Sequence, residues 1–159
     1  MTNHRRTTSD NNGDVDALEL LHAEHVRLLE MFGKLSDVRT RHRRGVEKKL
    51  ATAACEALTQ HSRIEAEIFY PALRAASNID DLLDDARIEH QTLDELVVEL
   101  SHTDARNADY RNKVHALAMY VAHHVHEEET KLFPRARASG IDLIELARKI
   151  ARRNAELEK

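Results

Sequence analysis

The sequence predicts an all-α protein, an antiparallel up-down-up-down four-helix bundle with a short extra C-terminal helix. The chain of 159 residues is the size of one domain with a single core. Its 4 Gly and 2 Pro are too few for the many turns of a β-sandwich or a β-barrel. Four long segments repeat apolar residues at steps of three and four, which is the period of one face of an α-helix.

The helices are expected to follow one another with short connections, which place consecutive helices antiparallel. Residues 1–14 are polar and are expected to form a flexible tail. The bundle is expected to span residues 15–138, with helices over 16–35, 46–72, 80–100 and 109–132. Asp80 or Asp81 is expected to cap the third of these helices. Residues 139–159 are expected to form the extra C-terminal helix.

Charge and cysteine content exclude several classes of function. The formal net charge of -4 argues against nucleic-acid binding, which needs a basic surface. The basic run between Arg39 and Lys49 lacks aromatic residues and is interpreted as a solvated patch. The single cysteine, Cys55, allows no internal disulfide and no cluster of thiolate metal ligands. No apolar run reaches the roughly 20 residues of a membrane span, and no signal peptide is recognisable, so a cytoplasmic protein without membrane partners is expected.

Histidine is the unusual feature of the composition, since 11 His accompany 28 Asp and Glu. Every expected bundle helix carries at least one His on its core stripe near mid-length, and two of them also carry a Glu. These residues are His25, His61, Glu65, His90, His124 and Glu128. An imidazole or carboxylate in a helical core costs several kcal/mol unless it is paired, hydrogen-bonded or bound to metal. Because all four helices carry such a group at a similar depth, a shared partner is indicated.

An internal repeat strengthens this interpretation. The segment HSRIEAEIFYPALRAA from His61 aligns without a gap with HVHEEETKLFPRARAS from His124. Both contain His, then Glu four residues later, then an aromatic residue followed by Pro. The Glu-His pairs that end at His25 and His90 repeat the other half of the pattern. A bundle with such a pseudo-twofold axis naturally places two metal ions on or beside the axis, with two symmetry-related carboxylates between them.

With these motifs the sequence resembles the hemerythrin HHE cation-binding domain family over residues 16–138. The resemblance implies a hemerythrin-like bundle with a non-heme di-iron centre, in which an oxo or hydroxo group bridges two iron ions. It implies bridging roles for Glu65 and Glu128 and terminal iron ligation by His25, His61, His90 and His124. It also implies small-molecule partners, namely dioxygen, peroxide or nitric oxide, in oxidative-stress response or in iron or redox sensing.

Some alternatives stay open at this stage. Oxygen-carrying hemerythrins resemble this pattern but have a fifth histidine where this chain has Asp94. Four His and two Glu leave positions free on each iron, which favours redox chemistry or sensing over oxygen transport. The centre could turn over a substrate as an oxidoreductase or only bind oxygen or metal, and zinc or manganese would accept the same ligands. A metal-free bundle whose histidines respond to pH is a further alternative. The roles of His22, Asp94 and Tyr120 are also open.

Overall fold

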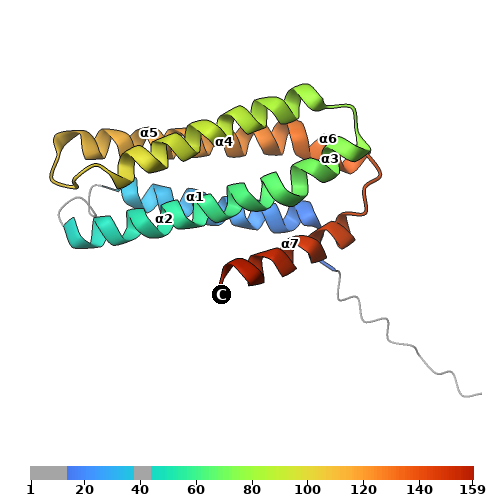
Figure 1. Cartoon of the computed structure of the whole chain (residues 1–159), viewed down its shortest axis with the longest axis horizontal. Helices are drawn as coiled ribbons and strands as arrows, with labels where there is room; N and C mark the ends of the chain where they lie inside the picture. Colours follow the sequence, from blue (N-terminus) through green and yellow to red (C-terminus); the bar gives the residue numbers. More distant parts are fainter. Residues whose placement is uncertain (1–13, 38–43) are drawn as a thin grey trace, which may run out of the picture.

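The computed structural model describes residues 14–37 and 44–159, which form helices and contain no β-strand. Four long helical stretches run side by side, and a further helix lies at the C-terminal end (Figure 1). The elements are α1 (Ala17–Ser36), α2 (Arg44–Ile64), η2 (Glu65–Phe69), α3 (Tyr70–Ala76), α4 (Asp80–Ser101), α5 (Ala108–Glu127), η3 (Glu128–Leu132), α6 (Phe133–Ala138) and α7 (Leu143–Leu157). The predicted helical bundle is therefore confirmed. Residues 1–13 of the expected tail and residues 39–43 of the basic run lie outside the described residues.

Side-chain caps fix the starts of three helices. Backbone N–H groups in the first turns of α1, α5 and α7 donate hydrogen bonds to the side-chain oxygens of Asp16, Asn107 and Asp142. Such a cap contributes about 1 kcal/mol to helix stability. The expectation that Asp80 or Asp81 caps α4 is wrong, because the residue before the helix is Ile79. Asp80 is instead the first helical residue, and its carboxylate accepts a hydrogen bond from Arg74 at 2.8 Å.

Two of the long stretches widen into π-helical turns beside the predicted ligands. The turns η2 and η3 begin at Glu65 and Glu128, and each is followed by a proline, Pro71 or Pro134, at the start of the next helix. A proline lacks the backbone N–H, and its ring clashes with the carbonyl four residues earlier in a regular α-helix. In η2 the backbone N–H of Tyr70 instead bonds to the carbonyl of Glu65, five residues back. The wider turn thus carries the helix past the proline, and π-turns of this kind are frequent at functional sites.

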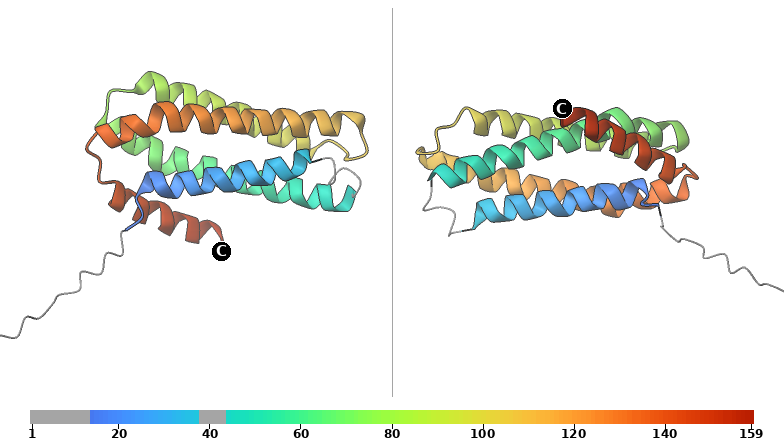
Figure 2. Two further views of the ribbon diagram at one scale, coloured as in Figure 1. Left: turned by 180° about the vertical axis from the view of Figure 1, so that it is seen from behind. Right: turned by 90° about the horizontal axis from the view of Figure 1, so that it is seen from below.

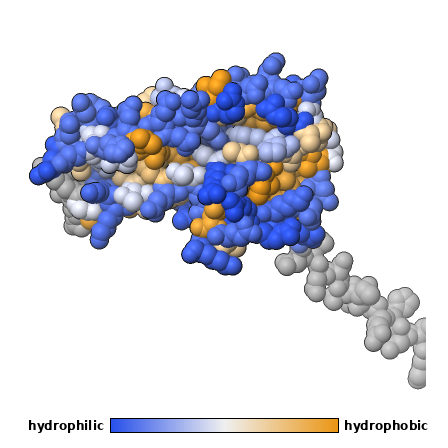
Figure 3. Space-filling view, in the orientation of Figure 1, coloured by the Kyte–Doolittle hydropathy of each residue, from blue (hydrophilic) through white to orange (hydrophobic). Residues whose placement is uncertain are grey.

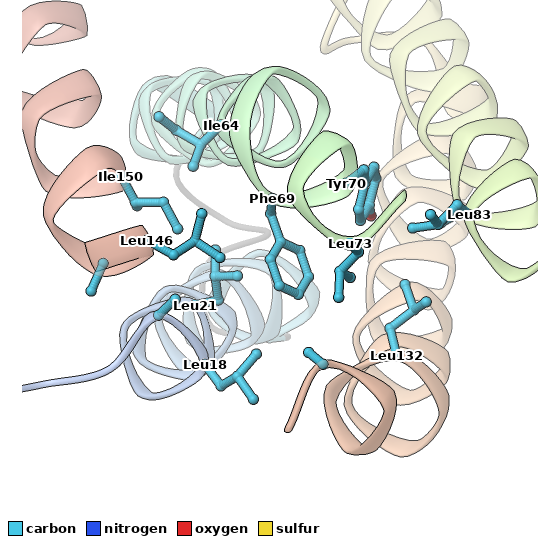
Figure 4. Close-up of a cluster of buried hydrophobic side chains, with 14 of the residues drawn as sticks. Leu18, Leu21, Ile64, Phe69, Tyr70, Leu73, Leu83, Leu132, Leu146 and Ile150 are labelled. Carbon is cyan, nitrogen blue, oxygen red and sulfur yellow. The ribbon is translucent and has the colours of Figure 1, made fainter. Parts of the chain in front are cut away.

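The long stretches pack as neighbours in the cyclic order α1, α2, α4, α5, and α7 lies along α1 and α2. Figure 2 shows α7 on the outside of the bundle from two further directions. The described core forms two apolar clusters. One cluster lies at the end that α7 covers (Figure 4) and includes Leu18, Leu21, Ile64, Phe69, Leu146 and Ile150. The other fills the rest of the bundle and includes Leu28, Phe32, Leu58, Leu93 and Leu117. Along every long stretch the change from one cluster to the other occurs at a predicted ligand.

Replacing Ile150 with Ala tests whether α7 is an integral part of the fold. Ile150 is fully buried in the cluster that α7 completes. We expect the substitution to lower the free energy of unfolding by about 2–5 kcal/mol, because it removes buried methyl groups and leaves a cavity. Urea denaturation of the metal-free protein measures the change, and the exposed Lys149→Ala on the same helix is the control. Equal stabilities of the two variants would mean that α7 contributes little to the core.

Candidate metal centre

The bundle brings all six predicted ligands into one buried polar layer. Each of the six is at most 7% exposed. Their donor atoms form two overlapping groups, and within each group all atoms lie within 4.8 Å of one another. One group contains His25, His61, Glu65 and His124, and the other contains Glu65, His90, His124 and Glu128. The layer separates the two apolar clusters of the core, so it lies in water-poor surroundings.

In one half of the layer the imidazoles of His25 and His61 face each other. Their Nε2 atoms are 3.2 Å apart. Glu65 Oε1 lies 3.0 Å from the Nε2 of His61 and 3.6 Å from that of His25. Glu128 Oε1 lies 3.9 Å from the Nε2 of His25. Adjacent ligands around one ion with bonds of about 2.1 Å lie about 3 Å apart. These separations are therefore of the size that a single ion would need.

The other half holds His90 and His124. The Nε2 atom of His90 lies 2.9 Å from Glu65 Oε2. The Nε2 atom of His124 lies 3.4 Å from Glu65 Oε2 and 3.3 Å from Glu128 Oε2. Glu65 and Glu128 thus turn Oε1 toward the first half and Oε2 toward the second. This is how two carboxylates would have to lie in order to bridge two ions.

A second row of carboxylates orients three of the imidazoles. The Nδ1 atoms face Glu side chains in the pairs His25 with Glu129 at 2.9 Å, His61 with Glu24 at 2.8 Å, and His124 with Glu89 at 3.0 Å. Ionised carboxylates only accept hydrogen bonds, so each Nδ1 carries the proton. In a neutral imidazole the Nε2 atom then presents its lone pair to the buried layer, as a metal ligand requires.

The polar atoms of the layer are arranged as a bound cation would require. Two Nε2 lone pairs at 3.2 Å, as in His25 and His61, repel each other unless a proton or a metal ion lies between them. Four buried side-chain polar atoms of the described chain have no hydrogen-bond partner, and three of them belong to the layer: Glu65 Oε1, Glu128 Oε1 and His124 Nε2. Buried polar atoms are normally satisfied. A set of imidazoles and carboxylates without thiolates suits iron, manganese or zinc.

Without metal, protons have to balance the negative charges of the buried carboxylates. Burial opposes the imidazolium form of His61, but the charge of Glu65 and the hydrogen bond to Glu24 outweigh burial and raise the pKa of His61 to about 10. Burial likewise opposes ionisation of Glu65, but the His61 charge and the other imidazoles lower the pKa of Glu65 well below its usual value. Burial and the charge of Glu65 raise the pKa of Glu128 well above its usual value. Metal uptake should therefore displace protons.

Tyr70 is a residue of this layer that the sequence interpretation did not assign. Its hydroxyl donates to Glu128 Oε2 at 2.9 Å and lies 3.1 Å from both Glu65 Oε2 and the Nε2 of His90. In the repeat, Tyr70 aligns with Phe133, whose ring stacks on His25 with 5.7 Å between the ring centres. The difference between tyrosine and phenylalanine at aligned positions was the available signal.

The three residues with open roles lie in different places. The Nδ1 atom of His22 bonds to Glu129 at 2.7 Å, so His22 supports a carboxylate of the second row. Asp94 is exposed and lines a cavity beside His90. Tyr120 is 48% exposed and belongs to neither donor group.

None of the helices in the described ranges has both the length and the apolar character that a membrane span needs.

The cavities of the described structure differ in whether their lining includes residues of the layer. A cavity of about 1090 Å³ is lined by residues such as Cys55 and Tyr110 and includes none of the six layer residues. A cavity of about 570 Å³ is lined by His90, and a much smaller one of about 30 Å³ is lined by Glu128.

Comparisons with known proteins agree with this geometry. The family model described as the hemerythrin HHE cation binding domain matches residues 16–136. The chain is similar to the crystal structure of a hemerythrin HHE cation binding domain-containing protein from Mycobacterium kansasii, with 28% sequence identity and a TM-score of 0.72. That match covers 90% of this chain and 87% of the other. No curated protein matches the chain. The family is one of cation-binding domains, and the buried layer of His and Glu could hold such a cation. The chain belongs to the hemerythrin HHE cation-binding domain family.

Proposed function

We propose that the protein is a non-heme di-iron protein that binds or reacts with dioxygen, peroxide or nitric oxide, in oxidative-stress response or in iron or redox sensing. The observation that carries the proposal is the pair of carboxylates, Glu65 and Glu128, each with one oxygen toward each pair of imidazoles. This arrangement supports a site for two ions, and the family favours iron among the ions that suit these ligands. A pair of irons supplies redox chemistry that no side chain of this layer has by itself.

The chain's own residues have three tasks in this function. His25, His61, His90 and His124 would be terminal ligands, and the second row of carboxylates would hold three of them in the required tautomer. The two apolar clusters exclude water on either side of the layer. The Tyr70 hydroxyl donates a hydrogen bond to Glu128 and is placed to keep that carboxylate in position.

Metal analysis tests the proposal. Protein expressed with iron should contain about two irons per chain and show the near-ultraviolet absorption of an iron centre, and His61→Ala should lower the iron content at least by half. His115→Ala, at an exposed histidine on α5, is the matched control and should keep both irons. The proposal is wrong if carefully folded protein holds neither iron nor a comparable metal and His61→Ala changes nothing.

A binding or storage module without turnover is the second candidate. The burial of all six residues, none more than 7% exposed, favours it because buried ligands protect bound metal. Assays of peroxide breakdown and ferrous oxidation on the iron-loaded protein separate the two candidates. Turnover that disappears together with the iron in His61→Ala supports an enzyme, whereas reversible binding without turnover supports the module.

A further inference from the structure

The cavity beside His90 gives one half of the layer a direct connection to the surface. It has a volume of about 570 Å³ and lies between the α2 to α3 stretch and α4. Figure 3 looks onto the side of the molecule that carries α2 and α4, where apolar surface shows among hydrophilic residues. The buried residues of its lining are Ser62, Tyr70, Leu83 and His90, and through Tyr70 and His90 the floor of the cavity is also part of the wall of the polar layer.

The floor contains polar groups that a ligand could satisfy. Ser62 is 6% exposed, and its Oγ atom has no hydrogen-bond partner within the described chain. A buried hydroxyl without a hydrogen-bond partner is unfavourable. Tyr70 lies beside it in the lining, with its hydroxyl on Glu65 and Glu128. A bound molecule that accepts a hydrogen bond from the Ser62 hydroxyl would satisfy this group.

The rim of the cavity is rich in arginine. Three arginines, Arg63, Arg74 and Arg87, line it together with one acidic residue, Asp94. The first two arginines already have partners outside the lining: Glu67 lies 2.7 Å from Arg63, and Asp80 and Asp84 lie 2.8 Å and 3.0 Å from Arg74. Arg87 makes no ion pair with any described residue. Its guanidinium is therefore available to an anion, which it can bind through two parallel hydrogen bonds.

The opposite half of the layer shows that this cavity is not a general property of the fold. In the repeat, the cavity residues Ser62, Ala66, Tyr70 and Arg87 align with Val125, Glu129, Phe133 and His22. There the Glu129 carboxylate accepts hydrogen bonds from the Nδ1 atoms of both His22 and His25, and the Phe133 ring stacks on His25. Side chains of the protein itself thus occupy the place that is open beside His90. The small side chain of Ala66 is the main reason for the difference.

We infer that the cavity beside His90 binds a small organic anion, with its charge on Arg87 and its apolar body between the helices above Ser62 and Tyr70. The volume falls within the range of about 300–1,000 Å³ typical of sites for organic ligands and is many times the roughly 30 Å³ of a water molecule. Leu83 and Pro71 supply apolar lining. The inference that this cavity is a substrate or effector site rests on the proposed function, because the bound molecule would lie next to the proposed iron-binding layer.

Benzoate and its neutral analogue benzamide are the probes, because they share a shape and differ in charge. Calorimetric titration of the full chain, with metal content determined for each sample, should show benzoate binding at least tenfold more tightly than benzamide. Arg87→Gln should remove most of this preference. Arg135→Gln, at an exposed arginine outside the cavity, should retain it.

A second variant tests the cavity by filling it. Ala66→Glu introduces the side chain that fills the equivalent place in the opposite half, and it should abolish benzoate binding while the helical circular dichroism stays unchanged. The inference is overturned if benzoate does not bind, if it binds no better than benzamide, or if neither variant alters its affinity. Titration of metal-free protein keeps the two proposals distinguishable: Arg87-dependent binding there supports the cavity site even where iron loading fails.

Discussion

Replacing Glu65 with Gln is expected to lower the bound metal from about two ions per chain to less than one, with helix content unchanged. Glu65 belongs to both donor groups, and its two oxygens lie 3.0 Å from the Nε2 of His61 and 2.9 Å from the Nε2 of His90. Glutamine keeps the volume of glutamate, but it lacks the charge, and one of its two oxygens is replaced by an NH₂ group that only donates. The variant therefore cannot present an oxygen ligand to both halves.

The affinity of any ion that remains should fall at least tenfold, since even residues that only support metal ligands change affinity by about 10- to 100-fold. Elemental analysis and competition with a chelator measure the two effects. Glu95→Gln, at an exposed glutamate on the neighbouring helix, is the control and should leave both values unchanged. Full metal content in Glu65→Gln would contradict the bridging role, and Glu128→Gln would then have to show the larger loss if either carboxylate bridges.

The six layer residues could be predicted because two independent patterns select them. The helical period places each on a core stripe, and the repeat aligns His61 with His124 and Glu65 with Glu128. Histidines on other faces, such as His115 and His123, fit neither pattern. Spacing along a helix fixes which side chains share a face, so it was sufficient to predict that these residues would meet in the core.

The second row of carboxylates could not be predicted in the same way, because each contact joins two different helices. Glu24 lies next to His25 in sequence but bonds to His61, and Glu89 lies next to His90 but bonds to His124. The repeated Glu-His pair signalled that the glutamates matter without showing which imidazole each one reaches. Such contacts depend on the rotation of one helix against another, which a single sequence does not specify.

The π-turns were missed for a different physical reason. A proline inside an apolar helical period predicts a kink or an end. Here Pro71 and Pro134 each follow a turn with one extra residue, so the helix continues. Propensity indicates where a regular helix is impossible but not which irregular turn replaces it. The two turns begin at Glu65 and Glu128, and this coincidence links the irregular backbone to the polar layer.

Metal-free protein is expected to lose stability as the pH rises from about 7 to about 10. The pKa of His61 is raised to about 10 in the folded protein, against about 6.5 in an unfolded chain. The imidazolium therefore stabilises the fold fully below pH 6.5, and this contribution declines above that value and is lost once the pH passes 10. Between these limits the free energy of unfolding should fall by about 1.4 kcal/mol per pH unit for one such group. The pKa of His124 is raised in the same direction by its contacts with Glu65 and Glu89, against the opposing effect of burial, so the decline should be at least this steep.

Urea denaturation of metal-free protein at a series of pH values measures this decline, and two comparisons identify its origin. Glu65→Gln should flatten the curve, since the charge of Glu65 is the largest cause that raises the pKa of His61. Iron-loaded protein should show little decline, because bound metal takes the place of the protons and requires neutral imidazoles. A metal-free protein whose stability is constant between pH 7 and 10 would show that His61 is not held as an imidazolium. The negative charge of Glu65 would then have to be balanced in some other way than by a proton on His61.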